Sequence, residues 1–251
     1  MKFELLIILL LLGIAALLIM LLRKARGIHL ATYRLLDDAQ ATRRESEALF
    51  SQLQALWALE RKLGLDEPLP SLRGWAGSPD FLLEVAREVE ALRPGVVVEC
   101  SSGSSTLVIA RCLQRLGAGH VYSLEHDPEY AAKTRALLAR HGLAQWATVL
   151  DAPLRSQGGG QPWYDDSVLP ADLAPIELLV IDGPPAATAP RAREPALPRL
   201  AARLAARCVV LADDADRPVE LEMVRRWIAA EPRWRVSRLP AEKGLARLQR
   251  G

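Results

Sequence analysis

The sequence has few cysteines, few aromatic residues and little excess charge of either sign. Its three cysteines form no CxxC pair and lie in apolar runs, so we expect neither a disulfide framework nor a cysteine-built zinc site. The formal net charge is +2, and basic residues among the first 26 account for it, which leaves the rest of the chain near neutral. Non-specific binding to DNA or RNA relies on a broad basic field, so we expect no nucleic-acid partner.

The chain also lacks the glycine fingerprint GxGxxG, which disfavours a nicotinamide dehydrogenase. The whole sequence is 50% hydrophobic and 25% charged, a balance typical of a folded protein rather than a disordered one. A length of 251 residues allows one domain plus an appendage.

The appendage begins with an uncharged run of 18 residues, 5–22, which as a helix covers roughly 27 Å. A buried core helix or a cleaved signal peptide are the alternatives, but no A-x-A site follows the run and the next residues are Arg23, Lys24, Ala25 and Arg26. The run predicts a transmembrane anchor over 1–26. Basic residues after it place the C-terminal side in the cytoplasm, as a single-pass protein of the inner membrane.

A helical stalk is predicted over 27–66. From 30 to 63 the chain has no proline or glycine, and leucines recur at steps of three and four residues. This pattern indicates either a helix packed on its own domain or a short coiled coil that makes a homodimer. Turn-rich clusters at 66–70 and 74–79 then mark the boundary with a domain that we place over 67–251.

Strand and helix patterns alternate along this domain. Strands are predicted over 96–100, 120–125, 147–150, 176–181 and 208–212, and helices over 81–92, 106–116, 128–141, 191–207 and 220–231. The alternation predicts an α/β fold with a doubly wound, mostly parallel sheet. Strand-like segments at 234–239 and 245–248 would add an antiparallel edge. In such sheets ligands bind where the strands end.

Polar residues follow the first three strands at their carboxyl ends. Gly103 lets the backbone approach a ligand, and the serines around it can cap the next helix. Glu125 follows Gly103 by 22 positions, near the spacing at which a carboxylate accepts both hydroxyls of a ribose. Asp127 suits a helix cap, and His126 a structural role or a ligand contact. Asp151 can accept from an exocyclic amine. The alternative is a capped turn without a ligand.

Three more acids follow the later strands: Asp182, Asp213 and Asp214. Together they can hold a divalent ion through oxygen atoms. The alternative is that one caps the next helix while another pairs with Arg217.

Five segments in this order resemble the class I S-adenosylmethionine-dependent methyltransferases, particularly a small bacterial type with E-x-G-S-G-x-S-T and I-D-G-P motifs. The segments are ECSSGSST, YSLEHDPEY, WYD at 163–165, LLVIDGPP and VVLADDADR. The resemblance implies a Rossmann-like seven-stranded sheet with an antiparallel last strand, and S-adenosylmethionine as cofactor.

The resemblance also implies roles for individual residues. Asp182 would face the transferred methyl group as the catalytic residue. The cofactor-binding set would surround methionine, ribose and adenine in turn, and consists of Glu99, Ser101, Gly103, Ser104, Ser105, Glu125, His126, Asp151, Ala152 and Asp182. Catechol-type enzymes carry acids at places matching Asp182, Asp213 and Asp214, which implies Mg²⁺ there. Ser101 departs from the pattern, since the family has the first glycine of the turn at this place.

The predicted function is therefore a membrane-anchored methyltransferase that acts on an unidentified acceptor, in our interpretation an oxygen. A catalytically silent membrane-anchored scaffold with the same fold is the alternative. The loop between Asp151 and Ile176, with glycines at 158–160 and Trp163, is either a substrate lid or a surface insertion.

Overall fold

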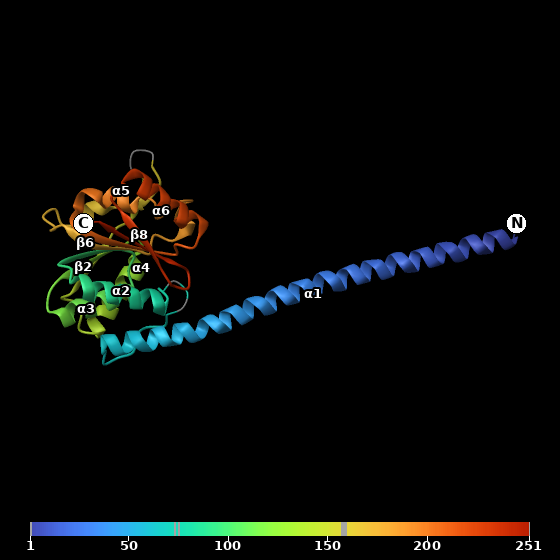
Figure 1. Ribbon diagram of the computed structural model, residues 1–251, viewed down its shortest axis with the longest axis horizontal. Helices are drawn as coiled ribbons and strands as arrows, with labels where there is room; N and C mark the ends of the chain where they lie inside the picture. Colours follow the sequence, from blue (N-terminus) through green and yellow to red (C-terminus); the bar gives the residue numbers. More distant parts are fainter. Residues whose placement is uncertain (1, 73, 75, 157–159, 251) are drawn as a thin grey trace. The chain divides into compact units, whose positions relative to one another are not determined.

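The computed structural model describes residues 2–72, 74, 76–156 and 160–250, with the side chains of 2–6, 8, 9, 41, 44 and 45 left out. Figure 1 shows the ribbon. The helices are α1 (Lys2–Leu63), α2 (Pro79–Leu92), α3 (Ser104–Leu116), α4 (Pro128–Arg140), α5 (Ala196–Leu200) and α6 (Pro218–Ala230). The strands are β1 (Val96–Cys100), β2 (His120–Glu125), β3 (Ala147–Asp151), β4 (Leu154–Arg155), β5 (Trp163–Tyr164), β6 (Ile176–Ile181), β7 (Leu204–Asp213), β8 (Arg235–Leu239) and β9 (Leu245–Arg250). Short 3₁₀ turns cover Asp166–Val168, Ala186–Thr188 and Ala201–Arg203.

Seven strands form one sheet in the order β3-β2-β1-β6-β7-β9-β8. The β1, β2, β3, β6 and β7 strands pair in parallel, whereas β9 runs antiparallel to both β7 and β8. The predicted doubly wound, Rossmann-like sheet with an antiparallel last strand is confirmed. The strand order reverses between β1 and β6, where such sheets bind ligands.

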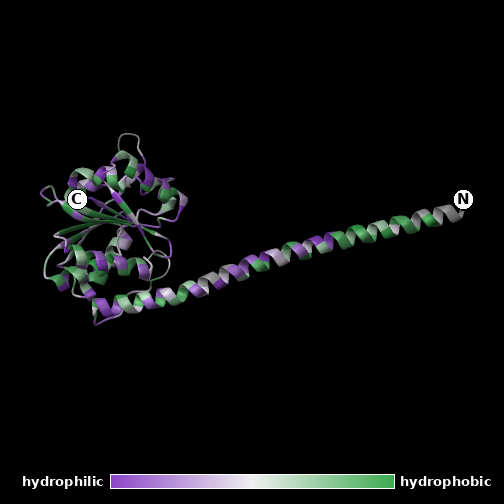
Figure 2. Ribbon diagram, viewed as in Figure 1, coloured by the Kyte–Doolittle hydropathy of each residue, from purple (hydrophilic) through white to green (hydrophobic). Residues whose placement is uncertain are grey.

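The sheet has an apolar core on each face. Figure 1 shows α2 and α3 on one side of the sheet and α5 and α6 on the other. Successive strand residues alternate between the two cores, since Val97 and Leu178 belong to the first and Val98 and Leu179 to the second. Both faces are covered, and Figure 2 shows the hydrophobic residues that line the central strands.

The segment before β7 differs from the prediction of a helix over 191–207. It contains the five-residue helix α5 and a 3₁₀ turn, and β7 begins already at Leu204. The start of β7, Leu-Ala-Ala-Arg, consists of good helix formers, so local propensity favours a helix where pairing with a neighbouring strand makes a strand. Part of the predicted 151–176 loop is also ordered differently, since β4 and β5 pair as a small antiparallel ladder.

The predicted membrane anchor is wrong. Within the described part of the chain, no helix combines the length and the apolar character that crossing a membrane requires. The α1 helix continues without a break into the polar residues seen in Figure 2. The predicted inner-membrane location depended on this anchor and is therefore wrong as well.

By its contacts the chain divides into two units, Met1–Phe50 and Ser51–Gly251. In the second unit, the last turns of α1 pack on the domain. Leu59 and Leu63 are fully buried in the core that also holds α2 and α3. Gln52 donates to Asp80 at 2.7 Å and Arg111 Nε donates to the main-chain oxygen of Leu63 at 2.9 Å. The turns from Ser51 to Leu63 therefore add to the same hydrophobic core as the sheet.

Candidate functional site

The site is built at the carboxyl edge of the sheet. Because β1, β2, β6 and β7 run parallel, the residues that follow them gather at one edge. Register pairs Glu99 with Val180 and Cys100 with Ile181, so the turn after β1 lies beside the turn after β6. The main-chain nitrogen of Asp182 donates to the oxygen of Cys100 at 3.3 Å and ties the two turns together.

The turn after β1 has an unusual backbone. Ser101 and Gly103 both have φ of +145°, a region that glycine adopts readily and that strains a residue with a Cβ atom. Nothing lies within 4 Å of the place where a Cβ of Gly103 would stand, so the space above this residue is open. The turn thus presents bare backbone to an open space at the start of α3, where free main-chain amides can receive a polar group.

Below the turn, Glu99 is completely buried. Its Oε2 accepts from Thr106 Oγ1 at 2.6 Å and from Ser123 Oγ at 2.7 Å. Burial raises the pKa of this carboxyl, while hydrogen bonds from Ser105, Thr106 and Ser123 oppose that rise. Its other oxygen, Oε1, has no hydrogen-bond partner among the described residues. A buried oxygen with an open lone pair beside an open turn suits a ligand that donates hydrogen bonds.

Glu125 lies next to this turn at the end of β2. Its Oε2 accepts from Ser102 Oγ at 2.8 Å, and its Oε1 accepts from the main-chain nitrogen of Asp127 at 3.0 Å and lies 3.0 Å from His126 Nδ1. The carboxylate is therefore held in place by the turn after β1, and it keeps lone pairs for further donors. Asp127 caps α4 as predicted, because it accepts from the main-chain nitrogens of Glu129 and Tyr130.

The remaining predicted cofactor residues differ in their burial. Ser104 and Ser105 open α3 and are buried. Ala152 is buried, and its nitrogen donates to the main-chain oxygen of Glu125 at 2.7 Å. Asp151 is exposed, and Arg135 Nη2 lies 2.9 Å from its Oδ2. Ser104 and Ser105 thus follow the turn after β1, and Asp151 and Ala152 stand at the end of β3.

Asp182, Asp213 and Asp214 come together at the ends of β6 and β7, with one oxygen of each within 4.8 Å of the others. A buried arginine stands among them. Arg193 Nη2 donates to the main-chain oxygen of Asp182 at 2.8 Å and to its Oδ1 at 3.1 Å, and it lies 2.8 Å from Asp214 Oδ2. Arg217 Nη1 lies 2.9 Å from the same Asp214 oxygen. Two arginine cations, Arg193 and Arg217, thus stand beside the three acids.

The pKa values of two of these acids are raised. Burial raises the pKa of Asp182 to about 6, against the opposing pull of Arg193. Burial and the neighbouring carboxylates raise the pKa of Asp213 to about 8. Asp182 is therefore mostly ionised at neutral pH, close to the range in which a carboxylate can take a proton.

The small ladder of β4 and β5 closes one side of the site. Trp163 and Tyr164 are 3% and 1% exposed. The Tyr164 ring lies 6.0 Å from the His126 ring, and its hydroxyl stands where a Cβ of Gly183 would be. Both aromatic residues belong to the apolar core on this face of the sheet. The predicted glycine run of this loop falls partly on 157–159, outside the described residues.

Unpartnered polar atoms concentrate at this edge. Among the described residues, buried side-chain atoms without a hydrogen-bond partner include those of Glu99, Ser101, Trp163, Arg193, Asp213 and Asp214. Buried polar atoms are nearly always paired, so such a concentration points to a ligand that supplies the missing partners.

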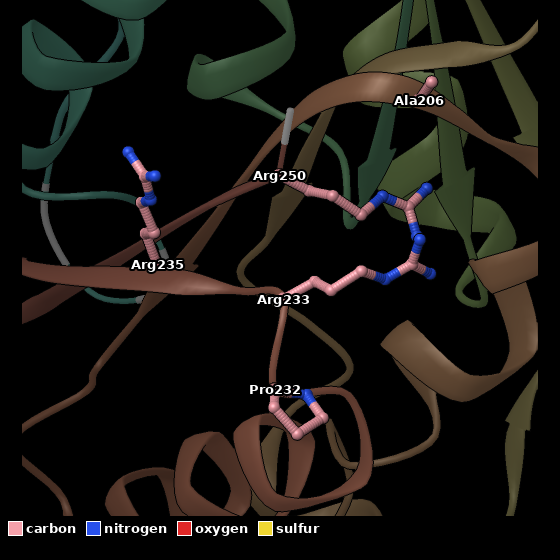
Figure 3. Close-up of a pocket in the computed structure, with 5 residues that line it drawn as sticks. All are labelled: Ala206, Pro232, Arg233, Arg235 and Arg250. Atoms are coloured by element: carbon pink, nitrogen blue, oxygen red, sulfur yellow. The ribbon is translucent and has the colours of Figure 1, made fainter.

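A cavity of about 610 Å³ lies elsewhere and has three arginines among its lining residues: Ala206, Pro232, Arg233, Arg235 and Arg250 (Figure 3). Ala206 precedes Asp213 by seven positions on β7, a separation of roughly 23 Å along the strand. This cavity is at the amino end of the strand and is separate from the site described above.

Arg193 is the residue that the sequence analysis missed. It lies in a segment with several other arginines, among them Arg191 and Arg199, and no local pattern distinguishes it. Only its burial, at 5% exposure, and its three carboxylate neighbours separate it from the others. By contrast, the sequence hypothesis of an acid paired with Arg217 is confirmed by the contact with Asp214.

Residues 98–215 match a family model described as a methyltransferase domain. No curated protein matches the sequence. Among solved structures, a methyltransferase of Podospora anserina bound to S-adenosylhomocysteine is similar, with a TM-score of 0.55, 15% identity and coverage of 70% of this chain and 80% of that one. An O-methyltransferase of Bacillus cereus in complex with S-adenosylhomocysteine has a TM-score of 0.54 and 20% identity, with coverage of 80% and 91%. A methyltransferase of Geobacter sulfurreducens has a TM-score of 0.53 and 14% identity, with coverage of 80% and 89%.

Proposed function

We propose that this chain, whose residues 98–215 form a methyltransferase domain, transfers the methyl group of S-adenosylmethionine to an oxygen of an acceptor molecule. The domain match bears out the predicted enzyme class. The observation that carries the proposal furthest is the open glycine turn after β1, which has the unpartnered Glu99 Oε1 beneath it and Glu125 beside it. The structural neighbours named as S-adenosylhomocysteine complexes support the choice of cofactor.

The residues of the turn suit the parts of this cofactor. Glu99 and the backbone from Ser101 to Ser105 would receive the methionine end, where an ammonium group can donate to Glu99 Oε1. Glu125 would accept from the ribose hydroxyls through its remaining lone pairs, with His126 beside it. Ala152 and Asp151, at the end of β3, would face the adenine.

When bound, S-adenosylmethionine supplies a methyl group on a positively charged sulfur, already a strong electrophile. The chain then has to align the acceptor and remove its proton. Asp182, mostly ionised at neutral pH and held by Arg193, would take the proton of the acceptor hydroxyl while the oxygen–carbon bond forms and the sulfur–carbon bond breaks. Trp163 and Tyr164 would provide the apolar wall that keeps water from the transfer.

An oxygen acceptor is supported by two features. Asp182 is a carboxylate suited to a hydroxyl proton, and the Bacillus cereus neighbour is named an O-methyltransferase. A catalytically silent scaffold is the second candidate, and Ser101 favours it, because its side chain occupies a strained backbone position at the turn. We place the catalytic domain at 67–251, with the last turns of α1 packed on it.

Calorimetric titration of the full chain with S-adenosylmethionine, S-adenosylhomocysteine and NAD tests the proposal. We expect binding of both sulfur compounds at micromolar concentration and none of NAD, after which acceptors with hydroxyl groups can be screened. Absence of binding by a chain with a cooperative thermal transition would overturn the proposal in favour of the scaffold. Binding of NAD alone would contradict both candidates.

A further inference from the structure

The guanidinium of Arg193 sits inside the cluster of Asp182, Asp213 and Asp214. Besides its contacts with Asp182 and Asp214, its Nη1 donates to the main-chain oxygen of Asp213 at 3.1 Å. The side chain is 6% exposed, so it is held by these oxygens and not by solvent. One buried cation therefore contacts all three residues that would make up a metal site.

The position of Arg193 conflicts with that of an ion. A divalent cation binds carboxylate oxygens at about 2.0–2.6 Å. An ion that bound both Asp182 Oδ1 and Asp214 Oδ2 would stand between these oxygens, where Arg193 Nη2 already lies 3.1 Å from the first and 2.8 Å from the second. Two positive charges so close together in a buried site would repel strongly. The arginine and an ion that bridges these two oxygens are thus mutually exclusive.

The charges are compensated without an ion. Arg217 adds a second guanidinium, 2.9 Å from Asp214 Oδ2, so two fixed cations face the three carboxyl groups. Arg193 also anchors Asp182 at two points, its main-chain oxygen and its Oδ1. A point charge such as Mg²⁺ would satisfy the carboxylates, but the planar fork of an arginine additionally orients them.

We propose that Arg193 is a built-in cation that takes the place of a divalent metal in this site, closes the acid cluster to Mg²⁺ and positions Asp182. Exclusion of Mg²⁺ from the cluster does not depend on the proposed function. Only the corollary, that methyl transfer needs no added metal, rests on the proposed function.

Binding of Mn²⁺, a paramagnetic substitute for Mg²⁺, tests the proposal directly by electron paramagnetic resonance on the full chain. The variants are Arg193→Met, which keeps most of the side-chain length and removes the charge, and the double variant Arg193→Met/Asp213→Asn. Arg191→Met is the matched control, because Arg191 is two residues away, is half exposed and pairs with Glu194. The measurement requires neither cofactor nor acceptor, so its result is independent of whether the chain binds S-adenosylmethionine.

We expect no stoichiometric Mn²⁺ binding by the wild type or by Arg191→Met. Arg193→Met should bind one Mn²⁺ at least tenfold more tightly than the wild type does, and the added Asp213→Asn change should abolish that binding. Stoichiometric binding by the wild type that Asp213→Asn removes would overturn the proposal. So would a folded Arg193→Met that binds no ion, because the arginine would then not be standing in for a metal.

Arg193→Met removes the cation that contacts Asp182 and Asp214, so Arg193→Lys provides a second test in case Arg193→Met does not fold. Lysine keeps the charge but cannot form the same fork of hydrogen bonds. We expect Arg193→Lys to exclude Mn²⁺ as the wild type does. Binding of Mn²⁺ by this variant at wild-type fold would contradict the claim that the positive charge closes the cluster.

Discussion

Ser101 shows how much a single residue matters in the turn after β1. Its φ of +145° lies where a side chain strains the backbone, and its buried hydroxyl has no partner among the described residues. The resemblance to methyltransferases had raised this position as a departure from a glycine. In the structure, the backbone at this position keeps a conformation that suits glycine although the residue is serine.

Replacing Ser101 with glycine should stabilise the chain by about 1 kcal/mol or more, since it removes both the strain and an unpaired buried hydroxyl. Thermal unfolding measures the gain, and calorimetry should show tighter cofactor binding. The control is Ser102→Gly, which should destabilise, because Ser102 lacks a positive φ and donates to Glu125. A loss of stability in Ser101→Gly would show that the serine is favourable where it stands.

Glu125→Ala should weaken S-adenosylmethionine binding by about ten- to a hundredfold, the equivalent of about 1.5–3 kcal/mol for hydrogen bonds to a charged group. Calorimetric titration gives the dissociation constant. Glu129→Ala serves as the control, since Glu129 is an exposed acid in the first turn of α4 that pairs with Lys133. An unchanged constant in Glu125→Ala would contradict the ribose assignment.

Asp213 should make stability depend on pH. Its pKa is raised to about 8 in the folded chain, so between its ordinary value and about pH 8 the folded state binds more protons than the unfolded state. The free energy of unfolding must then fall as the pH rises through this range. Asp213→Asn removes the effect, so we expect the Tm of this variant relative to that of the wild type to be higher at pH 8.5 than at pH 5 by several degrees. A gap in Tm that stays constant with pH would show that Asp213 titrates normally.

At the scale of elements, the strongly patterned segments were predicted and the weakly patterned ones were not. Apolar runs such as 176–181 and 120–125 are strands with the predicted bounds. The first part of β7 was predicted as helix, because Leu204 to Arg207 are good helix formers that become a strand only through their neighbours. The β4–β5 ladder escaped prediction, since two-residue strands have no period to detect.

The last turns of α1 are an element whose packing decides its role. Leu59→Ala should destabilise the chain by about 2–5 kcal/mol, because this fully buried side chain would leave a cavity in the core. Gln54→Ala is the matched control on the same helix, where the side chain is exposed and lies outside the apolar face, and should change stability little. Chemical denaturation followed by circular dichroism compares the two. Equal small effects would mean that these turns do not belong to the domain's cooperative core.

At the scale of the whole molecule, one face of α1 is left for a partner. Leu53 and Trp57, in the turns of α1 that belong to the second unit, are each more than half exposed and lie one turn apart on the same side of the helix. The buried Ala55, Leu59 and Leu63 lie on the opposite side of its last turns. Apolar residues at steps of four on an exposed helical face are typical of a helix that pairs with a second copy.

We therefore expect the chain to form a homodimer through this face, as the sequence pattern suggested. Light scattering coupled to gel filtration should give a dimer for the wild type and a monomer for Leu53→Lys/Trp57→Lys. The control Gln54→Lys/Ala58→Lys places the same charges on exposed neighbouring positions and should remain dimeric. A wild type that has monomer mass at every concentration would refute the dimer.

The sequence by itself determined the α/β order, the parallel sheet, the glycine turn and the acids at the strand ends. Each of these follows from local information: apolar periodicity, turn residues, and the position of a residue relative to the end of its strand. It also suggested a membrane span from an apolar run, which the described part of α1 does not support.

Only the tertiary structure decided where β9 inserts, which acids meet and that Arg193 stands among them. These facts depend on residues far apart in the chain, such as Arg193 and Asp213, twenty positions away from each other. One arginine among several gains its role from the burial and the carboxylates around it, and no local pattern records either. Whether the acid cluster can accept a metal ion is thus set by packing, because the cation that fills it comes from another segment of the fold.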